Sequence, residues 1–231
     1  MIKSLPVKSG KKLCRLIPLS FFVIFLNSCI GISMDIQMNR DGSGRLTMEY
    51  RISNLLESIG SLDGNASKPS IPVGREDWER TVERLSGVRL VSYSNKVNHN
   101  DSVVNVTLTF ANPQALSAII DSAGASRGMV LAAYNGQTGS LDLIVHKNQS
   151  SGYDQNLISL MRSFFTDYNF SLKFSASGSS LMTITDENGN AINTPSQAAA
   201  VTSGRSVSIS MGIMDIFDLP DGLGLKINWQ R

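Results

Sequence analysis

The residue with the most distinctive chemical setting is Cys29, which follows an apolar stretch close to the N-terminus. The stretch 16–26 is largely apolar, and Asn27 and Ser28 separate it from the cysteine. Five basic side chains and no acidic one precede it: Lys3, Lys8, Lys11, Lys12 and Arg15. A basic segment, a short apolar segment and a small residue before a cleavage point make a secretory signal peptide. We therefore predict that residues 1–28 are removed and that Cys29 becomes the N-terminal residue, with a thiol and an amine open to acylation.

The tetrapeptide Leu26-Asn27-Ser28-Cys29 resembles the lipobox of bacterial lipoproteins, in the looser form typical of spirochaetes. The resemblance implies that signal peptidase II cuts between Ser28 and Cys29. It also implies that Cys29 carries an S-linked diacylglycerol and an N-linked palmitoyl chain. One acyl chain binds a membrane only marginally, whereas two or three chains on one residue make the attachment effectively permanent. The implied location is the bacterial cell envelope, on the periplasmic face or the cell surface.

Two other interpretations of this N-terminal segment compete with the lipid anchor. A retained membrane-spanning helix needs about 20 apolar residues, but the stretch 16–26 has 11 residues and includes Pro18 and Ser20. An ordinary secretory signal favours small residues at both positions that flank the cut, and Asn27 fits that pattern poorly. Lipidation at Cys29 is the interpretation that the segment favours.

The charge and cysteine content of the mature part exclude several classes of function. Five of the 21 Lys and Arg residues lie in the signal, so 16 basic side chains remain against 19 acidic ones. We therefore predict no nucleic-acid partner, because such proteins present a basic patch. Cys14 leaves with the signal and Cys29 is acylated, so the domain has no thiol for a disulfide, a metal or a nucleophile.

One stretch imitates a catalytic motif. Gly124-Ala-Ser126-Arg-Gly128 matches the Gly-x-Ser-x-Gly elbow of hydrolases. That elbow needs a strand before the serine and a helix after it, whereas the pattern here predicts a helix before and a strand after. We expect a helix end and a loop, and we predict no catalytic residues.

Other stretches imitate metal sites. The segment from Asp186 to Asn190 resembles the start of a calcium loop, but it lacks the required glycine at the sixth position and glutamate at the twelfth. We expect a surface turn there. His99 and His146 are far apart in sequence and lack further ligands at zinc spacing. We therefore predict no metal-binding or cofactor-binding residues and no cofactor.

Hydrophobic periodicity predicts an α+β domain over 29–231. Strands alternate apolar and polar residues, and helices place apolar residues at i, i+4 and i+7, as Trp78, Val82 and Leu85 do. The expected fold is an antiparallel β-sheet built from hairpins, with about three helices packed on one face, and a mobile loop at 186–205. The expected helices are 54–59, 75–85, 114–122 and 154–166; the expected strands are 31–38, 45–52, 88–97, 102–110, 129–134, 141–146, 170–174, 181–185, 207–211 and 223–229.

The Asp41-Gly42-Ser43-Gly44 turn soon after Cys29, together with the strand-rich C-terminal part, resembles the LppM family of bacterial lipoproteins. The resemblance implies an envelope lipoprotein, and that family offers no established catalytic residues to carry over.

The predicted function is a non-enzymatic, lipid-anchored envelope protein that binds a protein partner or a lipid or other hydrophobic ligand. One alternative is an envelope hydrolase whose site is assembled from residues distant in sequence. Another is a structural subunit of an envelope assembly. A large apolar cavity would favour the first, convergent Asp, Ser and His side chains the second, and a large exposed apolar patch the third.

Overall fold

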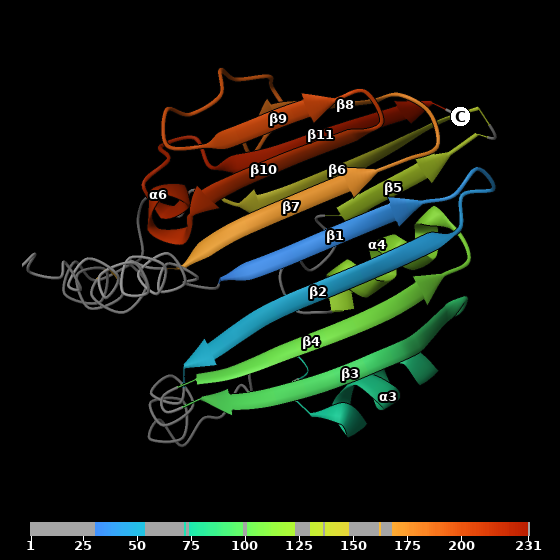
Figure 1. The fold of residues 1–231 in the computed structure, drawn as a ribbon. Coiled ribbons are helices and arrows are strands. Elements are labelled where there is room, and N and C mark those ends of the chain that lie inside the picture. The colour runs from blue at the N-terminus through green and yellow to red at the C-terminus, as the bar shows by residue number, and fades with distance from the viewer. Residues whose placement is uncertain are drawn as a thin grey trace, which may run out of the picture.

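A computed structural model describes residues 31–53, 72, 74–98, 101–122, 130–135, 137–147, 162 and 168–230. Figure 1 shows a broad sheet in front of a second layer that contains a smaller sheet and helices. The elements, in chain order, are β1 (Ile32–Met38), β2 (Gly44–Ser53), α3 (Arg75–Glu83), β3 (Val88–Asn98), β4 (Asp101–Phe110), α4 (Pro113–Ser122), β5 (Val130–Tyr134), β6 (Thr138–His146), β7 (Asn169–Ser175), β8 (Ser180–Thr185), β9 (Ala199–Ser203), β10 (Ser206–Gly212), α6 (Ile213–Phe217) and β11 (Leu223–Gln230).

The larger sheet has seven strands in the order β3-β4-β2-β1-β7-β10-β9. Most of its neighbours are antiparallel, but β1 and β7 run parallel, with Ile32 opposite Phe170 and Gln37 opposite Ser175. This parallel pair joins the hairpins of the N-terminal half to the strands of the C-terminal half. The sheet is therefore mixed.

The smaller sheet has four antiparallel strands in the order β5-β6-β11-β8. The last strand of the chain, β11, lies in its centre between β6 and β8. Hydrogen bonds from Ser180 N to Gly204 O (2.8 Å) and from Gln230 N to Ser179 O (2.9 Å) tie this sheet to the β9–β10 turn and to the segment before β8.

The core lies between the two layers, because strands such as β7 and β11 bury alternate residues on the side that faces the other layer. On β7, Phe170, Leu172 and Phe174 are buried, and on β11 Leu225, Ile227 and Trp229 are buried. The rings of Phe174 and Trp229 are 5.0 Å apart, a direct contact between the two sheets. Burying each large apolar side chain contributes about 1.5–3 kcal/mol, so this alternation supplies most of the stability.

The helices complete the second layer. The buried face of α4 is Ala115, Leu116, Ile119 and Ile120, and the helix contacts β3, β4 and β5. Helix α3 packs on β3 through Trp78, which is fully buried. The residues described include no helix long and apolar enough to cross a membrane.

The predicted α+β class is confirmed, with three corrections to its layout. The strands form two sheets rather than one, and the larger sheet contains the parallel β1–β7 pair. The stretch 186–205 is not simply a loop, because β9 within it pairs with β10. The short helix α6 was not predicted; five residues are too few to produce a recognisable helical period.

Helices 75–85 and 114–122 were predicted within two residues of α3 and α4. The predicted helix 54–59 lies outside the described residues. So does the predicted helix 154–166, apart from Arg162, which is helical.

A buried hydrogen-bond chain connects α3 to the larger sheet. The Trp78 indole Nε1 donates to the Tyr50 hydroxyl at 2.9 Å, and that hydroxyl donates to the carbonyl oxygen of Pro72. Tyr50 is 3% exposed, and burial raises the pKa of its phenol well above the ordinary value. The phenol therefore stays neutral and keeps its hydrogen bonds to Trp78 and Pro72.

Replacing Tyr50 with Phe should lower the free energy of unfolding by about 1–3 kcal/mol, because the variant leaves Trp78 Nε1 and Pro72 O buried and unpaired. Urea unfolding followed by circular dichroism measures this. Above about pH 10 the unfolded phenol ionises while the folded one does not, so wild type should lose stability there more steeply than the variant.

Ser33→Ala, which also removes one hydroxyl but from the exposed face of β1, should change stability by less than about 0.5 kcal/mol. Equal losses in the two variants would contradict a structural role for the Tyr50 hydroxyl.

Candidate functional site

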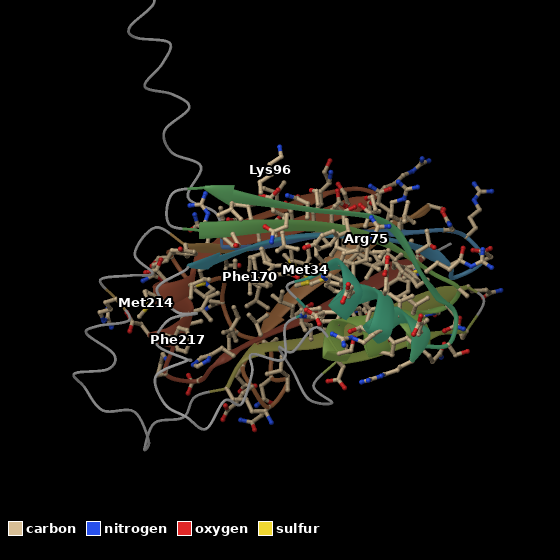
Figure 2. The ribbon with its side chains drawn as sticks, turned by 90° about the horizontal axis from the view of Figure 1, so that it is seen from below. Met34, Arg75, Lys96, Phe170, Met214 and Phe217 are labelled. Carbon is tan, nitrogen blue, oxygen red and sulfur yellow. The ribbon has the colours of Figure 1, made fainter. Side chains whose placement is uncertain are left out.

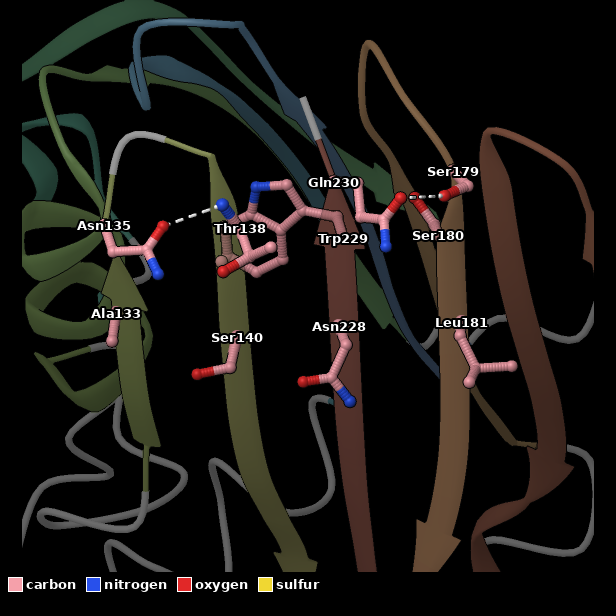
Figure 3. Close-up of a pocket in the computed structure, with 11 residues that line it drawn as sticks. Ala133, Asn135, Thr138, Ser140, Ser179, Ser180, Leu181, Asn228, Trp229 and Gln230 are labelled. Carbon is pink, nitrogen blue, oxygen red and sulfur yellow. Dashed lines mark hydrogen bonds between the residues drawn. The ribbon is translucent and has the colours of Figure 1, made fainter.

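A pocket of about 510 Å³ lies on the smaller sheet, near the end of β11. All four strands of that sheet contribute to it, together with Asn135 and Ser179 next to β5 and β8 (Figure 3). Its walls are Ala133, Asn135, Thr138, Gly139, Ser140, Ser179, Ser180, Leu181, Asn228, Trp229 and Gln230.

The register of the sheet places one row of outward-facing residues across the pocket. Ala133 lies opposite Ser140, Ser140 opposite Asn228, and Asn228 opposite Leu181. Figure 3 shows these four side chains in a line across β5, β6, β11 and β8. The two polar members are central and half-buried, whereas Leu181 is 58% exposed. The row therefore offers hydrogen-bonding groups in the middle and apolar contacts at both ends.

A second row closes the pocket at the end of the sheet. The Asn135 side-chain oxygen accepts hydrogen bonds from the backbone N–H groups of Gln137 (3.0 Å) and Thr138 (2.8 Å), which fixes the β5–β6 turn. Across the sheet the Ser179 hydroxyl donates to the Gln230 side-chain oxygen at 3.4 Å. The amide nitrogens of Asn135 and Gln230 are free of these bonds and can donate to a ligand.

Between these rows, Gly139, Trp229 and Ser180 lie side by side on neighbouring strands. Trp229 is 3% exposed, and its indole covers Gly139 so closely that a Cβ atom there would be 2.1 Å from Cζ2. The indole Nε1 has no hydrogen-bond partner among the described residues. Ser180 is buried, and its hydroxyl donates to the Arg205 carbonyl oxygen at 3.2 Å. In this part of the pocket the strand backbones form the wall, and the buried indole packs against Gly139.

The pocket walls carry no ionisable side chain among the residues that the structure describes. The neighbouring outward row holds Asp142 opposite Lys226, and their charged groups are 3.8 Å apart. These two charges compensate each other, so the pocket presents hydroxyls and carboxamides in a nearly neutral field. Such groups can bind and orient an uncharged ligand, but they offer no acid or base near neutral pH.

The structure tests some of the stretches that the sequence singled out. Asp186 forms a surface turn: its Oδ1 accepts from the backbone N–H groups of Asn188 and Asn190, both at 2.8 Å, and Gly189 has a positive φ of 85°. A hydrogen bond from the Asn190 side chain to Oδ2 (2.8 Å), together with these backbone hydrogen bonds, lowers the pKa of Asp186. The predicted turn is confirmed.

His146 lies at the opposite end of the smaller sheet from the pocket. Its ring centroid is 4.8 Å from that of Phe217, and burial lowers the pKa of its imidazole. The described residues hold no group of three or more His, Cys, Asp or Glu side chains that could bind a metal.

The remaining candidates lie outside the described residues. They are the lipobox Leu26, Asn27, Ser28 and Cys29, the Gly124–Gly128 motif, and His99.

Sequence reasoning did not identify the pocket residues Ser140, Asn228 and Gln230. The only available signal was the outward polar side of strands 141–146 and 223–229, which any half-exposed sheet shares. Which strands are neighbours, and hence which polar residues meet, depends on topology.

No protein-family model matches the chain, and no curated protein matches it. Among solved structures, the NMR structure of the folded domain of LppM from Mycobacterium tuberculosis is similar, with a TM-score of 0.40 and 12% identity. The match covers 89% of this chain and 92% of that one. At this identity and score the likeness carries no conclusion about function.

Replacing Gly139 with Ala should destabilise the fold by about 1–3 kcal/mol, because the added methyl collides with the Trp229 ring and forces it to move. Chemical unfolding followed by tryptophan fluorescence measures both the stability and the exposure of the ring.

Ser140→Ala on the adjacent outward position is the control, with an expected change below about 0.5 kcal/mol. The double variant Gly139→Ala/Trp229→Phe should lose less stability than the two single variants lose in sum, because the smaller ring leaves space for the methyl. Additive losses would show that the indole does not determine the need for glycine.

Proposed function

We propose that this protein is a lipid-anchored bacterial envelope lipoprotein without enzymatic activity, which binds an uncharged segment of a protein partner in the pocket on its smaller sheet. The anchor is the acylated Cys29, and the binding groups are the outward-facing polar side chains around Ser140, Asn228 and Gln230. The observation that carries the binding role is the neutral, hydrogen-bonding wall of the pocket.

The chemistry of the wall supports a peptide over a hydrophobic ligand. Hydroxyls and carboxamides supply both donors and acceptors, which complement the N–H and C=O groups of a peptide. Burying these groups against a hydrocarbon chain would leave them unpaired, at a cost of about 1–3 kcal/mol each. Ala133 and Leu181 at the two ends of the row can contact the apolar side chains of the same segment.

The same wall argues against two other ligand classes. A neutral sugar usually gains affinity by stacking on an exposed aromatic face, but the aromatic residue of this pocket, Trp229, is 3% exposed. A charged ligand would need a compensating charge from the protein. The two charges beside the pocket, on Lys226 and Asp142, already compensate each other. A hydrolase would need an acid, a base or an activated nucleophile at the site, and the described pocket residues include no ionisable group to provide one.

The lipid anchor is tested by intact-mass spectrometry of protein extracted from bacterial membranes. We expect a chain that begins at Cys29 and carries a diacylglycerol and a fatty acid, and that partitions into the detergent phase of a phase-separating detergent. Cys29→Ala should abolish both properties, because the thiol is the attachment atom. Cys14→Ala is the matched control and should change neither. An unmodified mature chain would contradict the anchor.

The binding role is tested by titrating ¹⁵N-labelled protein with N-acetyl-tetraalanine amide, an uncharged peptide. We expect amide shifts concentrated at Ser140, Asn228 and Gln230. Asn228→Leu keeps a similar volume but removes the carboxamide, so affinity should fall roughly tenfold, as expected for the loss of one or two hydrogen bonds. Ser33→Ala, on the larger sheet, is the control and should bind like wild type.

Equal affinity of wild type and Asn228→Leu would contradict the pocket as the binding site. A parallel titration with a neutral disaccharide distinguishes the ligand classes: shifts at the same residues with the sugar and none with the peptide would assign the pocket to carbohydrate.

A further inference from the structure

The short helix α6 presents two apolar side chains away from the core. Ile216 is buried, and Ile213 packs against the core beside it. Met214 and Phe217 are three residues apart and so lie on one face of the helix. Phe217 is 39% exposed. Figure 2 shows both side chains together at one end of the molecule.

This helix lies beside the start of β1. Gly31 packs directly on Asn169, since a Cβ on Gly31 would be 1.8 Å from the Asn169 carbonyl oxygen. Asn169 is opposite Gly212, the residue that precedes α6. Two strand spacings, about 10 Å, therefore separate Gly31 from the beginning of α6. Figure 1 shows α6 and the start of β1 at the same end of the larger sheet.

The chain between this end and the lipid is very short. Cys29 precedes Gly31 by two residues, and two fully extended residues span about 7 Å. A lipid on Cys29 therefore brings this end of the domain to the membrane surface. The helix beside it must lie at the level of the headgroups or just above them.

We propose that α6 inserts Met214 and Phe217 into the interfacial region of the bilayer that holds the Cys29 lipid, and so orients the domain on the membrane. Apolar and aromatic side chains on one helix face are the groups that bury in this region. The acyl chains supply the affinity, and α6 supplies the orientation. This inference rests on the lipid anchor proposed above.

The orientation has a consequence for the pocket. Strand β11 begins at Leu223, shortly after α6, and ends at Gln230 in the pocket wall. Its eight residues span roughly 23 Å. With α6 at the membrane, the pocket opens at the far end of the smaller sheet, where it is accessible to a partner.

The test uses a tryptophan placed at the helix as a depth reporter. The native Trp78 and Trp229 are 0% and 3% exposed and give a constant background. Full-length protein carrying Phe217→Trp is expressed with its lipid and reconstituted into vesicles of phosphatidylcholine brominated on its acyl chains, which quench only fluorophores that enter the bilayer. We expect the added emission to fall by about half or more relative to non-brominated vesicles.

The matched control is Leu181→Trp, another exposed apolar position (58%), which lies at the pocket end of the molecule. Its added emission should be unchanged by bromination. Thermal unfolding of both variants within a few degrees of wild type verifies that the fold is retained. If Phe217→Trp perturbs the fold, Met214→Trp on the same helix face serves as the reporter.

The outcomes separate the two proposals. An acylated mass with quenching at position 217 and none at 181 supports the membrane contact. An acylated mass with no quenching at 217, or with equal quenching at both positions, overturns the orientation and leaves the anchor intact. A mass without acyl chains overturns the anchor and, with it, the orientation.

Discussion

The parallel pairing of β1 with β7 is the interaction on which the rest of the structure depends. It joins residues 32–37 to 170–175, so it closes a loop of more than a hundred residues, which carries a large entropic cost. Burial of the alternate apolar side chains on both strands offsets that cost. Met34, Ile36, Leu172 and Phe174 all face the second layer only in this register, and a slip of one residue would turn them to solvent.

The pairing also determines where the functional features lie. Because β1 meets β7 at Ile32 and Phe170, the start of β1 lies at the same end of the larger sheet as α6. Because β7 carries Phe174 against Trp229, the smaller sheet is placed over the larger one and its pocket lies at the other end. One register therefore places α6 and the pocket at different ends of the domain, which is the arrangement that the proposed anchor and the proposed binding site require.

The pocket follows from the same two-layer construction. Strands β6 and β11 bury Leu141, Leu143, Leu225 and Ile227 in the core, and the outer face presents hydroxyls and carboxamides flanked by Ala133 and Leu181, beside one compensated ion pair. Gly139 leaves the space that the Trp229 ring occupies beside it. The buried Trp229 ring behind the pocket wall is largely apolar, whereas the side chains that line the pocket are mostly polar and uncharged. That combination favours recognition by hydrogen bonds over acid–base chemistry.

The sequence by itself determined the α+β class, helices α3 and α4, and most strands, because their periods of 3.6 and 2 are local properties that a short window contains. The turn at Asp186 was equally local, since its hydrogen bonds reach only to Asn190. The prediction of a signal and of an acylated Cys29 also rests on local pattern. Tertiary structure alone decided that β1 pairs with β7 and that Ser140 and Asn228 meet in one pocket. These contacts join residues distant in the chain, and the free energy that selects them comes from burying whole faces together, which no local pattern encodes.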